Sequence, residues 1–338
     1  MKIRLLINIL VLFVLACSQN HTTQNNPNIV FLSNRDAPKG KFDIFLLNME
    51  NDSLQNLSIN IKGITSISHP ILSPDGQKVL FVGFEKNKSL QLLDIQNKSV
   101  MTLAELKTDT PKASFSADGK FIVFVNKVNN KRQIIRIHTD GTNEKALSDF
   151  QAEDFDPCIS YDGLKIAFIR KIGKEHSLCI MDMNGKNFTT IAQLSGPCGH
   201  PSFSPDGKNI VFHAFNKGSN NIYNVNLKSR QVELIYQNNV RNVDPIFSPD
   251  GQYVAFLSNI RGMKYQDIIT LDIKTQSVKV ASNKINIINQ NPGFSPDGKK
   301  IVFESVMFNN SEIYVVNVNG KNLKNLSSHE SWDCSPSF

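Results

Sequence analysis

Several features that mark catalytic and metal-binding domains are scarce or missing in this sequence. No two of its five cysteines form a CxxC pair, so the sequence predicts neither a cysteine-based zinc site nor a small disulfide scaffold. Cys158, Cys179, Cys198 and Cys334 are therefore interpreted as small packing residues. There is no G-x-S-x-G motif, which argues against a serine hydrolase. The net charge of +7 is not gathered into a basic and aromatic stripe, so we expect no nucleic-acid partner.

Long apolar runs are also missing, and the longest lies at the N-terminus. It extends from Leu5 to Ala16 and follows two basic residues. Its 12 residues are too few for a helix to cross a bilayer core of about 30 Å, so residues 1–16 are interpreted as a signal peptide. The run ends in VLAC, which resembles a bacterial lipobox, and this resemblance implies a lipid on Cys17. The alternative is an ordinary secretory signal that happens to end at a cysteine.

The segment after this cysteine is polar and has no apolar periodicity, so residues 17–27 are expected to form a flexible tether. Ser18 stands where an aspartate would retain a lipoprotein in the inner membrane. By resemblance to lipoprotein sorting, we therefore expect an outer-membrane lipoprotein whose folded part faces the periplasm.

The most regular feature of the rest of the chain is a four-residue motif that occurs six times. Its serines are 43 to 47 residues apart, and such a period indicates a repeat architecture. The sequence SPDG stands at Ser73–Gly76, Ser204–Gly207, Ser248–Gly251 and Ser295–Gly298, with the variants SADG at Ser116–Gly119 and SYDG at Ser160–Gly163.

Each repeat predicts four short antiparallel strands. A short apolar segment precedes the motif, and a run rich in Val, Ile and Phe follows it. Proline presets the turn between them, aspartate can bond back to the backbone, and glycine takes the left-handed position. Two further runs, such as NIYNVNL and VELIY, complete the repeat. Four strands in about 40–45 residues are typical of a β-propeller blade, and the lack of helical periodicity disfavours a stacked solenoid.

The two ends of the chain predict how the ring closes. Residues 28–58 contain a repeat that lacks its first strand and turn, and Pro336–Phe338 matches the first strand of a later repeat, Pro201–Phe203. The last residues should therefore supply the missing innermost strand, which removes exposed sheet edges. We predict an all-β fold, a seven-bladed propeller over residues 28–338 with one blade shared between the termini, and a monomer.

The repeats resemble those of TolB-type propellers, which also occur in the propellers of prolyl oligopeptidase-like peptidases. The segment PSFSPDGKNIVF, which begins at Pro201, is a representative copy, and the resemblance covers residues 28 to 338. TolB has an α/β domain before its propeller and the peptidases have a hydrolase domain; we expect neither here. The resemblance to TolB, which binds a peptidoglycan-associated lipoprotein, implies an envelope protein of that kind as the partner, besides the membrane reached through the lipid anchor.

Propellers bind ligands at the mouth of the central channel, and the repeats indicate which residues stand there. The residue four places before each turn serine is expected to open the innermost strand at this mouth. We call these the rim residues: His69, Lys112, Asp156, His200, Asp244 and Asn291, with Ser335 as the equivalent in the shared blade.

Two further polar residues are expected near the rim. His213 and Glu304 lie in the second strand, at a position where the other repeats have Leu, Val or Ile. The alternative is that all these groups only cap strand starts and hold water in the channel.

Two functions remain open at this point. The favoured one is a membrane-anchored binding or scaffold protein of the cell envelope that docks a protein or small ligand. The alternative rests on Asp156, His200 and Asp244, since carboxylate and imidazole ligands suit a divalent metal ion. Some propeller lyases and lactonases use a channel metal, so this reading is a metal-dependent lyase or hydrolase acting on a saccharide or lactone. A glycan binder is disfavoured because only Trp332 and six tyrosines could stack on sugars.

Overall fold

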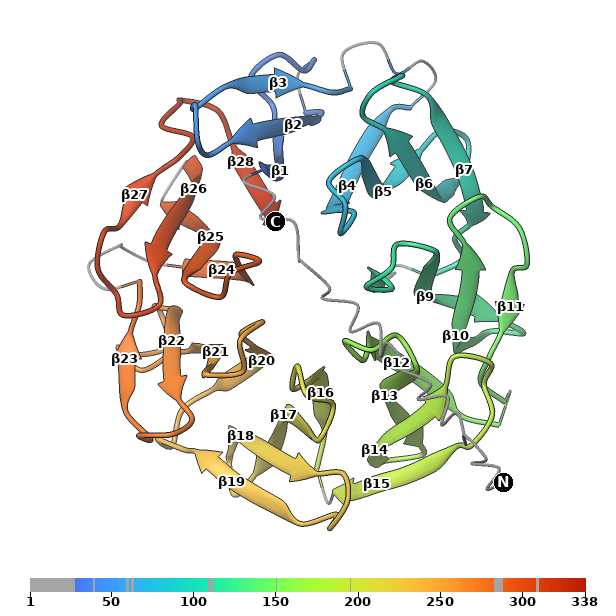
Figure 1. Ribbon diagram of the computed structural model, residues 1–338, viewed down its shortest axis with the longest axis vertical. Coiled ribbons are helices and arrows are strands. Elements are labelled where there is room, and N and C mark those ends of the chain that lie inside the picture. Colours follow the sequence, from blue (N-terminus) through green and yellow to red (C-terminus); the bar gives the residue numbers. More distant parts are fainter. Residues whose placement is uncertain are drawn as a thin grey trace, which may run out of the picture.

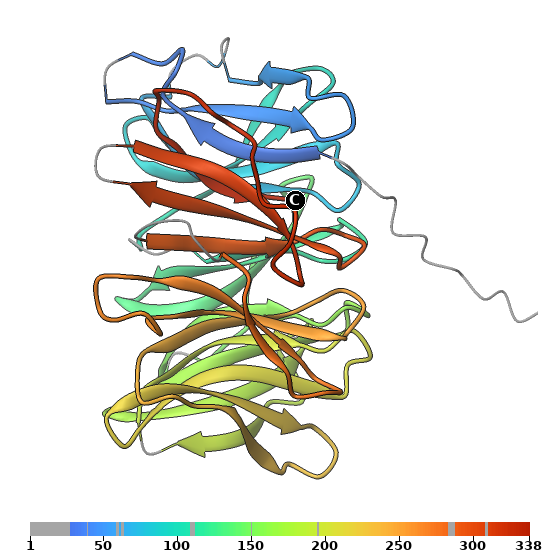
Figure 2. The ribbon, with the colours of Figure 1, turned by 90° about the vertical axis from the view of Figure 1, so that its left-hand side faces the viewer.

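The computed structural model describes residues 28–338, except 39, 59–60, 62–63, 109–111, 150, 195, 283–287 and 308–309. These residues form seven four-stranded antiparallel sheets arranged in a ring, which confirms the predicted seven-bladed propeller (Figure 1). Figure 2 shows the ring from the side as a thick disc that the strands cross from face to face. Within the described ranges there is no helix that could span a membrane. The predicted signal peptide, lipidated cysteine and tether lie outside the described residues.

The blades are numbered from the shared one, and their strands are given from the channel outward. Blade 1 contains β28 (Asp333–Ser337), β1 (Asn28–Ser33), β2 (Asp43–Asn48) and β3 (Leu54–Asn56). Blade 2 contains β4 (Ser66–Leu72), β5 (Lys78–Phe84), β6 (Lys88–Asp94) and β7 (Val100–Glu105). Blade 3 contains β8 (Ala113–Phe115), β9 (Phe121–Val128), β10 (Lys131–His138) and β11 (Lys145–Ala146).

The remaining four blades follow in chain order. Blade 4 contains β12 (Glu153–Ile159), β13 (Lys165–Ile172), β14 (Glu175–Asp182) and β15 (Thr189–Leu194). Blade 5 contains β16 (Cys198–Phe203), β17 (Asn209–Asn216), β18 (Ser219–Asn226) and β19 (Val232–Tyr236). Blade 6 contains β20 (Asn242–Phe247), β21 (Tyr253–Ser258), β22 (Asp267–Asp272) and β23 (Val278–Val280). Blade 7 contains β24 (Ile288–Phe294), β25 (Lys300–Met307), β26 (Asn310–Asn317) and β27 (Lys324–Asn325).

The repeated SPDG turn connects the first and second strands of each of blades 2 to 7, as predicted. In blade 5, the hydroxyl of Ser204 donates a hydrogen bond to Asp206 Oδ1 at 2.6 Å and accepts one from the backbone N–H of Asn209 at 2.9 Å. Gly207 has φ +66°, a left-handed conformation that glycine adopts without a steric cost. Because one serine satisfies both the aspartate and the next strand, the four residues specify the turn locally.

The core consists of apolar layers between neighbouring blades. In each of the seven second strands a central phenylalanine is at most 1% exposed. The layer that joins blades 7 and 1 includes Phe31 and Phe45 from one blade and Val302 and Ile313 from the other, so the ring closes by the same packing as its other joints. The seven phenylalanines are Phe31, Phe81, Phe124, Phe168, Phe212, Phe256 and Phe303.

The four cysteines of the described chain form no disulfide. Cys179 and Cys198 are buried, while Cys158 and Cys334 are half-buried. Each packs in or against an apolar layer between blades. Burial raises the pKa of the Cys179 thiol to about 11, so this thiol stays protonated at neutral pH.

The shared blade is formed as predicted, because β28 pairs with β1 in antiparallel register. Figure 1 places the C-terminus at the inner edge of the ring. Asp333, the first residue of β28, is fully buried and forms an ion pair of 2.8 Å with Arg35, which follows β1. The strand therefore begins three residues before the predicted Pro336 and is held by charge as well as by backbone hydrogen bonds.

In blades 2, 4, 5, 6 and 7 the sequence also placed the start of the innermost strand too late, whereas in blade 3 the strand begins directly after Lys112. His69 was expected to open its strand but is the fourth residue of β4, and Asp244 is the third residue of β20. The reason lies in the backbone: in six blades the rim residue has a left-handed φ and is followed by proline, which interrupts the extended pattern in mid-strand.

Candidate functional site

The rim residues occupy β-bulges in six of the seven blades. In blade 5 the register shifts between Gly199 and Ser202, so that His200 and Pro201 together face Phe212 of the next strand. A bulge of this kind turns the side chain of the extra residue away from the ladder. The left-handed backbone costs a non-glycine residue about 1–2 kcal/mol. The six residues have φ between +52° and +55°: His69, Asp156, His200, Asp244, Asn291 and Ser335.

Four of these bulges, those of blades 4 to 7, line a cavity of about 610 Å³ at the mouth of the channel. Five rim residues line it, whereas His69 and Ser335 do not, nor do His213 and Glu304. Three polar lining residues were missed, because no periodic signal marks them: Arg241, Gln266 and Gln290. The five rim residues in the cavity wall are Lys112, Asp156, His200, Asp244 and Asn291.

His200 lies at the centre of this group. Its Nδ1 is 3.1 Å from Asp244 Oδ1 and its Nε2 is 3.6 Å from Asp156 Oδ2, so the ring stands between the two carboxylates. Lys112 Nζ, which comes from blade 3, is 3.4 Å from His200 Nδ1. The mouth thus joins side chains of blades 3, 4, 5 and 6 into one polar cluster with charges of both signs.

This arrangement does not fit a metal ion held by the three predicted ligands. An imidazole binds a metal through one nitrogen, but the two nitrogens of His200 face different carboxylates. The ammonium of Lys112 also stands beside Nδ1, where it would repel a cation. Across the described ranges, no group of three or more His, Cys, Asp or Glu side chains is placed to hold a metal.

His213, which was predicted near the rim, has a structural task. The backbone N–H of Asp244 donates a hydrogen bond to His213 Nδ1 at 3.3 Å, which connects blade 5 to the bulge of blade 6. Gly199 makes room for the ring, since a Cβ there would lie 3.0 Å from His213 Cε1. Burial, reinforced by the nearby His200, lowers the pKa of His213 to about 4. The ring is therefore neutral at pH 7 and accepts a hydrogen bond at Nδ1.

The depressed pKa of His213 predicts a loss of stability in acid. The unfolded chain, with a His pKa near 6.5, binds the proton more tightly than the folded chain does. Stability should therefore be full above about pH 6.5 and fall towards pH 4, by up to about 3 kcal/mol for this group. Urea denaturation at several pH values should show the slope, and His213→Leu, which copies Leu257 of blade 6, should reduce it. An identical slope in both proteins would contradict this role.

Glu304 has a related task at the joint between blades 7 and 1. It is only 3% exposed and accepts the backbone N–H of Ser335 at 3.0 Å. It also accepts hydrogen bonds from Gln290, Asn291 and Ser311 at 2.9 to 3.1 Å. A buried carboxylate with four donors is well satisfied, so Glu304 fixes β24 and β28 rather than facing a ligand.

Asp156 both bonds the backbone of the next blade and faces the cavity. Its Oδ2 accepts the backbone N–H of His200 at 3.2 Å, which connects blades 4 and 5, and the residue also lines the cavity. The alternative reading, in which rim groups only support strands, thus describes His213 and Glu304. Lys112 and Asn291 remain exposed in the cavity wall, and the His200 and Asp244 side chains are 30% and 32% exposed. A ligand can therefore reach these four rim residues, and it can also reach Arg241, which is exposed in the same wall.

Comparison with known proteins supports the repeat assignment. Residues 138–269 match a family model described as the TolB beta propeller domain. TolB from Acinetobacter baumannii is similar in structure, with a TM-score of 0.61 and 19% identity over 92% of this chain and 66% of that protein. A manganese complex of oligogalacturonate lyase has a TM-score of 0.67 at 14% identity, over 87% of each chain. Puromycin hydrolase (S511A mutant) reaches 0.70 at 11% identity, over 90% of this chain and 52% of that one. At these identities the likeness shows the propeller fold alone.

Proposed function

We propose that this chain, which is a TolB-type β-propeller, is a binding protein of the cell envelope that docks a segment of a partner protein at the channel mouth. The observation that supports this is the convergence of Lys112, His200, Asp244 and Asn291 on a cavity of about 610 Å³. All four side chains are exposed or half-buried. Strained backbone holds His200, Asp244 and Asn291 in place, and the backbone N–H groups of His200 and Asp244 also bond side chains of the preceding blade. A site of fixed polar groups that solvent still reaches is suited to binding.

The charges of the mouth indicate the chemistry of the partner. Lys112 and Arg241 supply positive charge, and Asp156 and Asp244 supply negative charge, around the same cavity. A polypeptide segment carries acceptors, donors and charges of both signs, so it can match such a surface. The metal-dependent lyase remains unsupported, because the three candidate ligands do not converge on one point.

Site-specific crosslinking tests the mouth directly. A photo-crosslinking amino acid in place of Asn291 should capture a partner in intact cells. The same amino acid in place of Lys120, which is exposed beside the SADG turn of blade 3, should not. His200→Ala and Lys112→Ala should each lower the crosslinked yield, as expected for a roughly tenfold loss of affinity, or ~1.4 kcal/mol. Adducts from the Lys120 position alone would move the docking site off the channel.

We propose in addition that Cys17 carries the lipid that attaches the propeller to the outer membrane. The proposal rests on the lipobox-like VLAC and on the polar residues 17–27 that follow it. Cys17→Ser should move the protein from the membrane fraction to the soluble fraction, because one acylated cysteine is the only anchor that the sequence indicates. Continued membrane attachment of a correctly exported Cys17→Ser protein would refute the anchor.

A further inference from the structure

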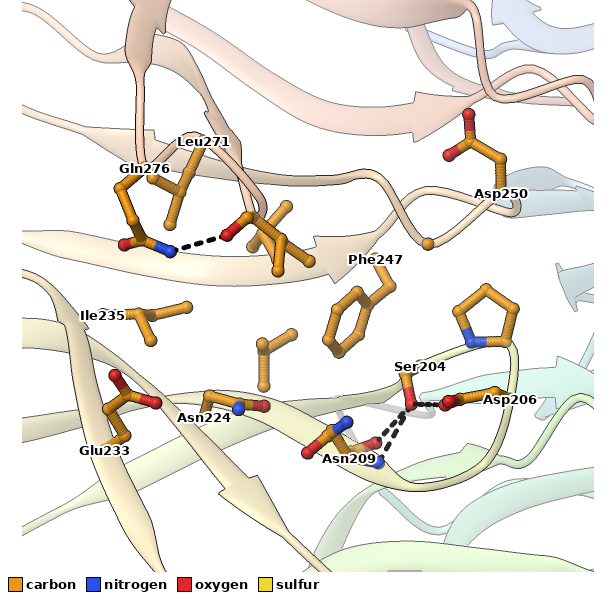
Figure 3. A pocket seen from close by; sticks show the side chains of 15 residues that line it. Ser204, Asp206, Asn209, Asn224, Glu233, Ile235, Phe247, Asp250, Leu271 and Gln276 are labelled. Carbon is orange, nitrogen blue, oxygen red and sulfur yellow. Dashed lines mark hydrogen bonds between the residues drawn. The ribbon is translucent and has the colours of Figure 1, made fainter.

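A second cavity, of about 430 Å³, lies between blades 5 and 6, at the end of the strands where the SPDG turns stand (Figure 3). Its apolar wall contains Val211, Ile235 and Phe247. Figure 3 shows Asn224 and Glu233 next to each other at one end of this cleft. Its volume is within the range of about 300–1,000 Å³ that is usual for small-ligand sites.

In other blades, the residue equivalent to Asn224 bonds the neighbouring blade. In blade 3 the equivalent residue is Arg136. Arg136 pairs with Val123 and Asn224 pairs with Val211, and each of these valines directly precedes the central phenylalanine of its blade. Arg136 reaches into blade 4, where Nη1 donates hydrogen bonds to Met183 O at 2.5 Å and to Asn184 Oδ1 at 3.0 Å. This arginine therefore bridges two blades with its guanidinium.

Blade 6 uses the same position in a similar way. Its residue there is Thr270, whose hydroxyl donates a hydrogen bond of 2.9 Å to Val318 O of blade 7. Asn224 has no such partner: its buried Oδ1 accepts no hydrogen bond. A buried polar atom without a partner costs free energy, and it is ready for a donor that enters the cleft.

The joint between blades 5 and 6 also differs from two other joints in the sign of the charge beside it. The residue paired with Arg136 is Lys145, whose Nζ donates to Asn184 O of the next blade at 3.0 Å. In blade 7 the corresponding Lys324 forms an ion pair of 3.0 Å with Asp52 of blade 1. The residue paired with Asn224 is Glu233. Where two other joints have a cation that crosses to the next blade, this one has a carboxylate.

Two further carboxylates, Asp206 and Asp250, line the cleft, and none of the described residues that line it is a lysine or arginine. Lys208, beside the wall, pairs with Asp206 at 3.3 Å, so Glu233 and Asp250 carry the negative charge that has no cationic partner within the described residues. The cleft is therefore anionic around an apolar wall, and a long cationic side chain would complement both parts. Arginine suits it better than lysine, because a planar guanidinium can donate to the Asn224 amide oxygen and to the Glu233 carboxylate together.

We propose that this cleft binds an arginine side chain of a basic peptide segment from a partner. The methylenes of the arginine lie against Val211, Ile235 and Phe247, and its guanidinium bonds Asn224 Oδ1 and pairs with Glu233. The incoming residue takes the role that Arg136 has within the chain at the joint of blades 3 and 4. The proposal does not depend on the channel mouth, which lies at the other end of the innermost strands.

Calorimetric titration of the folded protein with two peptides tests the ligand. The probes are N-acetyl-Gly-Arg-Gly-amide and the same peptide with citrulline, which has the shape of arginine but no charge. The arginine peptide should bind at least tenfold more tightly, and added salt should weaken it. Equal affinity for the two peptides, or no binding of the arginine peptide, would overturn the proposal.

Two variants locate the site. Glu233→Gln should weaken the arginine peptide about tenfold, whereas the control Glu144→Gln, an exposed glutamate of blade 3, should leave affinity unchanged. Asn224→Arg should fill the cleft as Arg136 fills its own joint, so it should abolish binding and raise the melting temperature. Full binding in Glu233→Gln would refute the proposal even if Asn224→Arg fails to fold.

Discussion

Removal of residues 333–338 should leave a chain that cannot form a stable monomer. The deletion takes away all of β28, so β1 loses its inner partner and Val30 and Leu32 lose a covered sheet edge. It also removes Asp333, the buried partner of Arg35. Because the ring is closed only through this blade, we expect a loss comparable with the whole stability of a domain, ~5–15 kcal/mol.

Thermal melts and size-exclusion chromatography measure this effect. The truncated chain should melt far below the intact protein and form aggregates through the open edge of β1. A synthetic peptide of residues 331–338 should restore part of the melting temperature by pairing with β1, and a scrambled peptide should not. An unchanged melt and a monomeric elution would show that β28 does not close the ring.

Asp154→Ala is expected to have the second largest effect. Asp154, in β12, is fully buried, and both of its oxygens accept hydrogen bonds of 2.8 Å from Arg170 of β13. The arginine itself is 8% exposed; its other ion-pair partner is Asp149, and its guanidinium lies 4.5 Å from the centre of the Phe188 ring. Loss of the carboxylate leaves a nearly buried guanidinium without its main counter-charge, which should destabilise the fold by about 3–5 kcal/mol.

Urea denaturation measures this loss, and a double variant provides the control. Asp154→Leu with Arg170→Met replaces both charges by apolar groups, and its stability should be close to that of the unmodified protein. If the single and double variants are equally destabilised, the effect comes from lost packing and not from the unpaired charge.

The sequence by itself determined the repeat, the turn chemistry and the closure of the ring. The turn chemistry depends on interactions between residues close in the chain, such as the hydroxyl of Ser204 bonding Asp206 and the N–H of Asn209. The central phenylalanines, Phe212 among them, were recognisable for the same reason, because strand periodicity assigns each side chain to one face. The match between Pro336–Phe338 and the other repeats then identified the shared blade.

Only the tertiary structure decided which polar residues face a cavity and which join the blades. His213 and Glu304 occupy the same position in their repeats, and each accepts a hydrogen bond from the backbone of the following blade instead of facing the cavity. The cleft at Asn224 is likewise recognised only by comparing its joint with that of blades 3 and 4, which the guanidinium of Arg136 bridges. Such contacts join residues about 30 to 50 positions apart, and their geometry depends on how neighbouring sheets twist and pack, which no local propensity encodes.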